Sequence, residues 1–310
     1  MEMEIPVIDF SKLKSEKRGQ TMALLHEACQ KWGFFMIENH DVDTELMEKV
    51  KALTKAHYDH YMKPGFLDSD AAKSLSANEY VPDMDWESTF FICHRPDNTI
   101  NDIAALSQHL RILLRRQSMD KYIDQVIALA EKLSELMCEN LGISRAHMME
   151  AFAGSRGPSV GTKVAMYPEC PHPELMRGLR EHTDAGGIIL LLQDDQVPGL
   201  EFLKGGEWVK IPPSKNNRIF VNIGDQVEIV SNGVYKSAVH RVMAMKEGNR
   251  ISVATFYNPG GDAVISPAAE LLLPRDIQFK DYLKLYTKTK FGDKAIRFQS
   301  LKTSMAATEN

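Results

Sequence analysis

The C-terminal half of the chain is a succession of short apolar runs separated by turn residues, and this pattern limits the possible folds more than any other feature. From Gly161 onwards the runs recur at spacings of about ten residues, as in antiparallel sandwiches and barrels. Gly205-Gly206 separates two of them as the turn of a hairpin. The sequence therefore predicts a mainly β protein with flanking helices and a jelly-roll core. The expected strands are residues 187–193, 200–203, 208–211, 218–223, 227–230, 237–244 and 250–257.

The first part of the chain is mostly helical in pattern. The expected elements are a strand at 5–10, a helix at 20–32 ending at Gly33, a strand at 34–37, a helix capped by Thr44, and a helix at 122–137. Residues 62–101 show no clear period and are expected to form a loop with at most one short strand, at 89–92. We therefore expect a helical region, residues 1–150, to pack on a β domain, residues 151–310. That domain ends in a helix at 279–286, whose Leu283 and Tyr286 pack on the barrel.

The charge balance argues against two classes of binding protein. The 310-residue chain has 37 Lys and Arg residues against 42 Asp and Glu, so no basic field is available for nucleic acid or an anionic membrane. No apolar run approaches the roughly 18 residues of a membrane span, and the N-terminus lacks the pattern of a secretory signal.

The four cysteines are far apart and form no CxxC pair, as expected of reduced thiols in a cytoplasmic protein.

His182-Thr183-Asp184 is the sharpest local feature of the sequence. Residues two apart on a strand point to the same side, so the imidazole and the carboxylate can converge on one point. With a distal histidine they would form the two-histidine, one-carboxylate triad of non-haem Fe(II) oxygenases. His240 is the only histidine after Asp184 and is therefore the candidate third ligand. The alternatives are a chance HxD or a hydrogen-bonded His–Asp pair, with His240 as a core histidine.

Arg250-Ile251-Ser252 follows the candidate ligand by ten residues. The strand period places the guanidinium of Arg250 and the hydroxyl of Ser252 side by side. Such a pair suits a carboxylate or bicarbonate, because arginine donates in a planar, bidentate arrangement. An ordinary surface arginine on a β-strand is the alternative. Each of these features is weak alone, but together they appear in the order HxD, His, RxS on successive strand-like segments.

That order resembles the double-stranded β-helix Fe(II) oxygenases. A closer similarity is to the plant 1-aminocyclopropane-1-carboxylate oxidases, which form ethylene, and it extends from Ile5 to about Phe298. The segments that carry it are 85–91 (DWESTFF), 138–142 (CENLG), 161–164 (GTKV), 180–191 (REHTDAGGIILL), 193–195 (QDD) and 256–259 (FYNP). Lys163 and Arg180 are the most discriminating residues, because most plant 2-oxoglutarate oxygenases have glycine in place of Arg180 and no general counterpart of Lys163.

The resemblance implies an enzyme that oxidises 1-aminocyclopropane-1-carboxylate with O2 and ascorbate to ethylene, CO2 and cyanide, the last step of ethylene biosynthesis. It implies Fe(II) on His182, Asp184 and His240, ascorbate as co-substrate and bicarbonate or CO2 as activator. Lys163, Arg180 and Arg250 are the implied catalytic cations. The residues expected around the substrate and bicarbonate are Lys163, Tyr167, Arg180, Arg250, Ser252 and Arg297. We expect a monomer that takes a small-molecule substrate.

Lys163 and Tyr167 are four residues apart on a strand pattern and therefore share a face, as Arg180 does with His182. Positive side chains around a metal pocket would hold the carboxylate of an amino-acid substrate and an anionic activator. Without the resemblance, Lys163 would be read as a solvated lysine on an edge strand. Two other functions remain open: a 2-oxoglutarate-dependent hydroxylase of a plant small molecule, and a catalytically silent β-helix protein that binds a small ligand.

The chain departs from the family pattern at two positions. The family usually has Asn-His-Gly where this chain has Asn39-His40-Asp41. Because aspartate can adopt a left-handed backbone at modest cost, we expect the turn to tolerate it. Near the C-terminus many members have Arg-Phe-Glu, whereas this chain has Gln299 after Arg297-Phe298, so any acid–base role of that glutamate is missing here.

Overall fold

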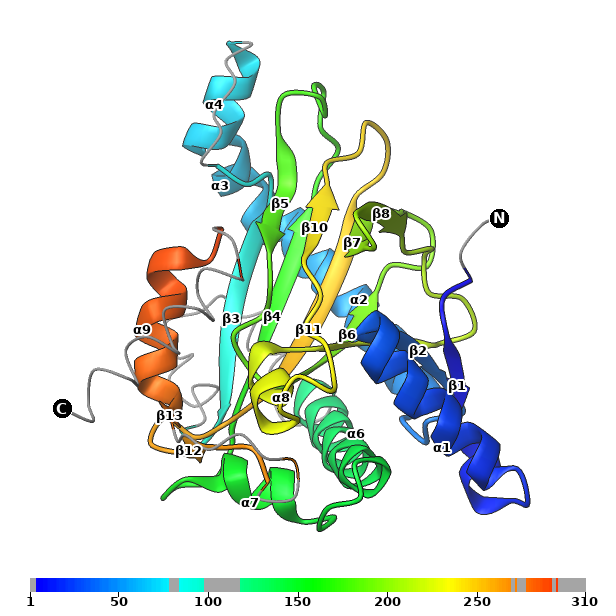
Figure 1. Cartoon of the computed structure of the whole chain (residues 1–310). Coiled ribbons are helices and arrows are strands. Elements are labelled where there is room, and N and C mark those ends of the chain that lie inside the picture. The colour runs from blue at the N-terminus through cyan, green and yellow to red at the C-terminus, as the bar shows by residue number, and fades with distance from the viewer. Residues whose placement is uncertain are drawn as a thin grey trace, which may run out of the picture.

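Two β-sheets pack face to face in this computed structural model, which describes residues 4–77, 84–97, 118–268, 271, 277–291 and 294 (Figure 1). The larger sheet has the order β1-β2-β9-β6-β11-β4-β3 and the smaller one β5-β10-β7-β8. Apolar side chains of both sheets form one buried cluster between them, including Phe34, Leu191, Phe202 and Val242. The predicted jelly-roll core with flanking helices is confirmed.

The strands are β1 Val7–Asp9, β2 Phe34–Glu38, β3 Ser88–Arg95, β4 Ser159–Tyr167, β5 Arg177–His182, β6 Ile188–Gln193, β7 Leu200–Lys204, β8 Glu207–Lys210, β9 Ile219–Ile223, β10 His240–Met243, β11 Arg250–Asn258, β12 Val264–Ile265 and β13 Ile277–Gln278. The helices are α1 Arg18–Glu27, α2 Thr44–His57, α3 Lys63–Leu67, α4 Asp70–Ser76, α6 Met119–Asn140, α7 His147–Ala153, α8 Asp225–Val230 and α9 Phe279–Thr289. Shorter turns are the 3₁₀ helix η1 (Phe10–Lys14) and the π-helical η2 (Ala28–Trp32) and η3 (Tyr58–Met62).

Helices α1, α2 and α6 cover the outer face of the larger sheet (Figure 1). In α6 the buried residues recur at helical spacing, because Tyr122, Val126, Leu133 and Met137 lie on one side of the helix. They share a core cluster with sheet residues of β1, β2, β4, β6, β9 and β11. Strands β1, β2 and β3 come from the N-terminal region but belong to the same sheet as the later strands. No helix among the described residues is long and apolar enough to cross a membrane.

The hairpin of β7 and β8 has the predicted Gly-Gly turn. Gly205 and Gly206 have φ values of +59° and +87°, and two successive left-handed residues match the twist of the paired strands. Asp41 also adopts a left-handed backbone, with φ +64°, as expected for an aspartate in place of glycine. All four cysteines are free thiols.

Tertiary contacts overrode several local predictions. Residues 227–230, expected as a strand, belong to helix α8, because backbone N–H groups at its start donate to carbonyls of residues 184, 186 and 187. Residues 62–101 contain helices α3 and α4 as well as β3; Ser69 caps α4 by accepting a hydrogen bond from the Ala72 N–H. On α9, Tyr286 is buried as expected, whereas Leu283 is 39% exposed.

The cap of α2 is Asp43, not Thr44, because the carboxylate of Asp43 accepts from the N–H groups of Glu45 and Leu46. We expect Asp43→Ala to lower the free energy of unfolding by about 1 kcal/mol, since both donors lose their partner. Thr44→Ala, one residue later, is the matched control and should change stability by less than half as much. Urea unfolding of the three proteins measures the difference. An equal loss in both variants would contradict the assignment of the cap.

Candidate active site

Strand pairing brings the two histidines of the predicted triad together. Strands β5 and β10 are antiparallel neighbours, and their register places His240 directly opposite His182. Asp184 follows β5 at the start of a turn, and its two carboxylate oxygens lie 3.8 Å from His182 Nε2 and 3.5 Å from His240 Nε2. One ligand atom from each residue lies within 4.8 Å of the others, and all three side chains are buried. In the described part of the chain this is the one such cluster able to hold a metal ion.

Neighbouring groups orient these ligand atoms. His182 Nδ1 lies 2.7 Å from the Arg180 carbonyl and His240 Nδ1 lies 3.3 Å from the Ala238 carbonyl, so each ring can donate there and present Nε2 as an acceptor. Burial lowers the pKa of His182 well below its usual value, and His240 and Lys290 lower it further, which favours the neutral imidazole that a metal requires. Two imidazoles and one carboxylate converging in this way fit the donor set of a non-haem Fe(II) site.

Asn222 is a ligand-orienting residue that the sequence analysis missed. Its side-chain amide donates a 2.8 Å hydrogen bond to Asp184 Oδ2 from strand β9. It is the single polar residue in the buried run Ile219–Ile223, and a buried amide within an apolar strand could have been recognised as a sign of a specific partner.

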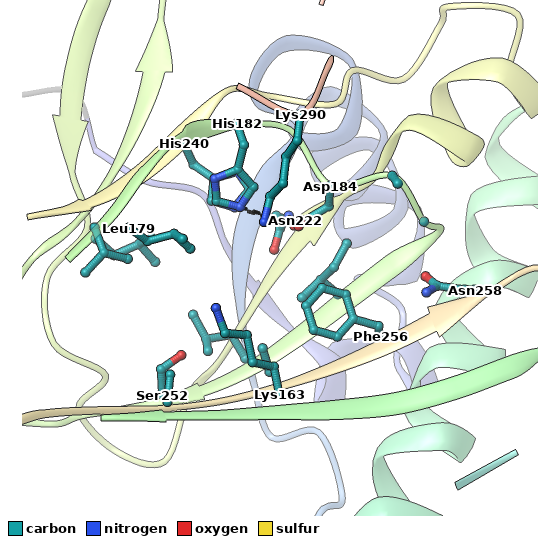
Figure 2. A pocket seen from close by; sticks show the side chains of 18 of the residues that line it. Lys163, Leu179, His182, Asp184, Asn222, His240, Ser252, Phe256, Asn258 and Lys290 are labelled. Carbon is teal, nitrogen blue, oxygen red and sulfur yellow. Dashed lines mark hydrogen bonds and ion pairs between the residues drawn. The ribbon is translucent and has the colours of Figure 1, made fainter. Parts of the chain in front are cut away.

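A cavity of about 320 Å³ opens beside the triad between the two sheets (Figure 2). Among the described residues, its charged lining apart from the triad consists of three cations: Lys163 from β4, Arg250 from β11 and Lys290 from the end of α9. Ser252 and Tyr167 also line it, together with apolar side chains such as Leu179 and Phe256. Lys290 was not predicted from the sequence, because it lies in a polar segment with no distinguishing pattern, and only the packing of α9 directs it into the cavity.

Arg250 is an interior arginine rather than a surface one, being only 2% exposed. Its Nη2 donates to Gln193 Oε1 at 3.0 Å, and its guanidinium lies 5.4 Å from the centre of the Tyr167 ring. Its Nη1 is buried without a hydrogen-bond partner among the described residues. Leaving such a donor unpaired is costly, so the site is suited to an anion that would accept from it. Ser252 lies two residues along β11 and lines the same cavity.

Lys163 and Arg180 are each paired with an acid from the segment before β3. The ammonium of Lys163 contacts both carboxylate oxygens of Glu87, at 2.7 and 2.8 Å, while its side chain lines the cavity. Arg180 does not line the cavity: its Nε lies 3.0 Å from Asp85 Oδ1, and its guanidinium stacks 3.9 Å from the ring centre of Phe291.

Burial raises the pKa of Tyr167 well above its ordinary value, and the nearby charge of Glu87 raises it further, so the phenol stays neutral. Burial also lowers the pKa of Lys290, and repulsion by Lys163 acts in the same direction. Nearby acids, Asp184 first among them, offset these effects only in part, so Lys290 presents an incompletely compensated positive charge to the cavity. Arg297 and Gln299 lie outside the described residues.

Comparison with known proteins agrees with this geometry. Residues 158–259 match the 2OG-Fe(II) oxygenase superfamily, and residues 5–64 match the N-terminal region described as non-haem dioxygenase in morphine synthesis. The chain is 61% identical to 1-aminocyclopropane-1-carboxylate oxidase 1 of Arabidopsis thaliana, over 97% of this chain and 95% of the relative. It is 45% identical to 1-aminocyclopropane-1-carboxylate oxidase 1 of Malus domestica, over 96% of each chain.

Among solved structures, the crystal structure of JOX2 in complex with 2OG, Fe and JA is similar, with a TM-score of 0.79 and 30% identity over 97% of this chain and 89% of that one. The rice dioxygenase for auxin oxidation shares the fold, with a TM-score of 0.72 and 24% identity over 92% of this chain and 95% of that one. Identity is thus higher to these two 1-aminocyclopropane-1-carboxylate oxidases than to either of these solved structures. The chain therefore belongs to the 1-aminocyclopropane-1-carboxylate oxidases, within the 2OG-Fe(II) oxygenase superfamily.

Proposed function

We propose that the protein oxidises 1-aminocyclopropane-1-carboxylate with O2 and ascorbate to ethylene, CO2 and cyanide. His182, Asp184 and His240 would hold Fe(II), which when bound supplies the redox chemistry that activates O2. The observation that carries the proposal is the combination of this triad with a small cavity whose other charged lining is cationic. Ascorbate supplies electrons, and bicarbonate or CO2 acts as the activator.

The cavity suits a small zwitterion. Its volume of about 320 Å³ is at the lower end of the range for ligand pockets, which favours an amino acid over a large substrate. The unpaired Nη1 of Arg250 and the hydroxyl of Ser252 would hold bicarbonate or the substrate carboxylate. Tyr167, beside the guanidinium, would restrict the orientation of that anion.

Lys163 and Lys290 supply the remaining positive charge. Lys163 forms an ion pair with Glu87, whereas Lys290 forms no ion pair with an acid among the described residues. An incoming carboxylate would relieve the repulsion between the two ammonium groups, so its binding would be favoured by both. Arg180 would act from outside the cavity, by supporting Phe291 beside His182, and Arg297 remains part of the proposal through the family pattern alone. The enzyme would act as a monomer.

A product assay tests the proposal. Purified protein with Fe(II), ascorbate, bicarbonate and 1-aminocyclopropane-1-carboxylate should release ethylene into the headspace without consuming 2-oxoglutarate. Parallel samples with 2-oxoglutarate should form no succinate beyond the level without protein. Succinate formation without ethylene would contradict the proposal and favour the 2-oxoglutarate-dependent hydroxylase. Failure to bind Fe(II) anaerobically would favour the silent, ligand-binding protein.

Two variants extend the assay to the cations. Lys163→Met removes a charged donor from the cavity, and a hydrogen bond to a charged group contributes roughly 1.5–3 kcal/mol, so kcat/KM should fall by about 10- to 100-fold. Glu87 would be left without its counterion, and the double variant Lys163→Met/Glu87→Gln controls for that loss of stability. Arg180→Gly should cost less activity, because its side chain lies outside the cavity. Fe(II) binding by Lys163→Met should remain near that of the wild type, as should thermal unfolding of the double variant, and unchanged ethylene formation by Lys163→Met would remove Lys163 from the site.

A further inference from the structure

The carboxylate of Asp225 is fully buried beside the candidate metal site. It accepts hydrogen bonds from segments that are far apart in the sequence. Its Oδ2 accepts from the hydroxyl of Thr183, the residue between two candidate ligands, and from the hydroxyl of Tyr282 on α9. Its Oδ1 accepts a 2.7 Å hydrogen bond from the hydroxyl of Ser237, three residues before His240. One carboxylate thus links the chain segments that carry the three candidate ligands to the C-terminal helix α9.

Backbone hydrogen bonds reinforce this connection. The N–H of Asp225 donates to the carbonyl of Asp184 at 2.8 Å, and the N–H of Gln226 donates to the carbonyl of Gly186 at 2.9 Å. On the side of α9, the hydroxyl of Tyr286 donates to the carbonyl of Thr183. The ligand-bearing turn therefore lies between α8 and α9 and is hydrogen-bonded to both.

The C-terminal segment supplies a cation near Asp225. The ammonium of Lys294 lies 3.9 Å from Asp225 Oδ1, and it also contacts the carboxylate of Glu228 and the carbonyl of Ser237. A buried carboxylate is stable only when paired and hydrogen-bonded. The segment after α9 thus helps to stabilise the anion on which the turn depends.

The docked position of α9 in turn completes the cavity. Lys290, at the end of the helix, enters the cavity near the triad (Figure 2). The ring of Phe291 lies 6.2 Å from that of His182. If α9 moved away, the cavity would lose Lys290 and the His182 ring would lose its contact with Phe291. The position of α9 and the geometry of the ligands therefore depend on the same buried contacts.

We propose that Asp225 and Tyr282 are positioning residues that couple metal binding to the docking of α9. Because the turn 182–184 is held by the same carboxylate as the helix, ordering of either one stabilises the other. Coupling of this kind is reciprocal: a metal that binds the docked state more tightly must also favour docking. The inference rests on the proposed metal site and adds to it a mechanism by which the cavity closes when the metal is bound.

Tyr282→Phe tests the coupling, since it removes one hydroxyl and keeps the ring. The dissociation constant for Fe(II), measured by anaerobic titration of the full chain, should rise by about tenfold, as for other residues that orient metal ligands. Hydrogen exchange measures the second effect: Fe(II) should slow amide exchange in residues 279–289 of the wild type, and this protection should be largely lost in the variant. Asp225→Asn should show the same two changes more strongly.

Tyr235→Phe is the matched control. Tyr235 is equally buried, and its hydroxyl bonds to the Met137 carbonyl and to His26, away from the metal site. It should leave Fe(II) affinity and the protection of α9 unchanged. The coupling is refuted if Tyr282→Phe retains both the Fe(II) affinity of the wild type and the protection of α9 by Fe(II). It is also refuted if Tyr235→Phe weakens Fe(II) binding as much as Tyr282→Phe does. Failure of the wild type to bind Fe(II) would instead refute the proposed metal site, and the inference with it.

Discussion

Alanine in place of His182, Asp184 or His240 is expected to abolish iron-dependent ethylene formation. Each substitution removes one of the three proposed protein ligands, and the residual pair would hold Fe(II) weakly and in the wrong geometry. The loss should reach at least about 1,000-fold in kcat, equivalent to roughly 4 kcal/mol in the activation barrier. Headspace ethylene and anaerobic Fe(II) titration measure activity and binding separately.

His40→Ala is the appropriate control for these variants. His40 is also buried, but its ring contacts the Asn217 carbonyl at 2.7 Å, on a different part of the surface from the cavity. This variant should lose some stability and retain iron binding and turnover. Near-normal activity in any one of the three ligand variants would eliminate that residue as a ligand.

Arg250→Lys is expected to give the second large effect. Lysine keeps the charge but loses the planar fork, and so cannot donate both to Gln193 and to an anion in the present arrangement. Since a hydrogen bond to a charged group contributes roughly 1.5–3 kcal/mol, the concentration of bicarbonate or substrate needed for half-maximal rate should rise by about 10- to 100-fold. Ethylene production measured against bicarbonate and then against substrate identifies which anion is affected.

Arg218→Lys serves as the matched control for Arg250→Lys. Arg218 precedes a strand of the same sheet and pairs with Glu38 at 2.6 Å, but does not line the cavity. It should leave both concentration dependences unchanged. If Arg250→Lys also leaves them unchanged while the fold is intact, Arg250 is a structural residue and the anion site lies elsewhere.

Local patterns were sufficient to predict much of the fold. The period of α6 and the Gly205-Gly206 turn depend on the backbone and on residues a few positions apart, and both are present in the structure. The prediction of a strand at 227–230 was wrong because α8 begins where its N–H groups meet carbonyls of the turn at 184–187, some forty residues earlier. Thr44 was mistaken for the cap because Asp43 and Thr44 are both good capping residues, and only the helix boundary distinguishes them.

The order HxD, His, RxS identified the residues of the predicted site, and the sequence by itself therefore determined which groups were available to the chemistry. Only the tertiary structure decided how they meet: the pairing of β5 with β10 sets His182 opposite His240, and packing between the sheets buries Arg250. The same packing leaves Arg180 outside the cavity and directs Lys290 into it. The physical reason is that residue type and spacing fix which side-chain groups are present and the side of a strand on which each lies. The distances between groups on different segments are set by the register of the sheet and by the buried contacts of Asp225.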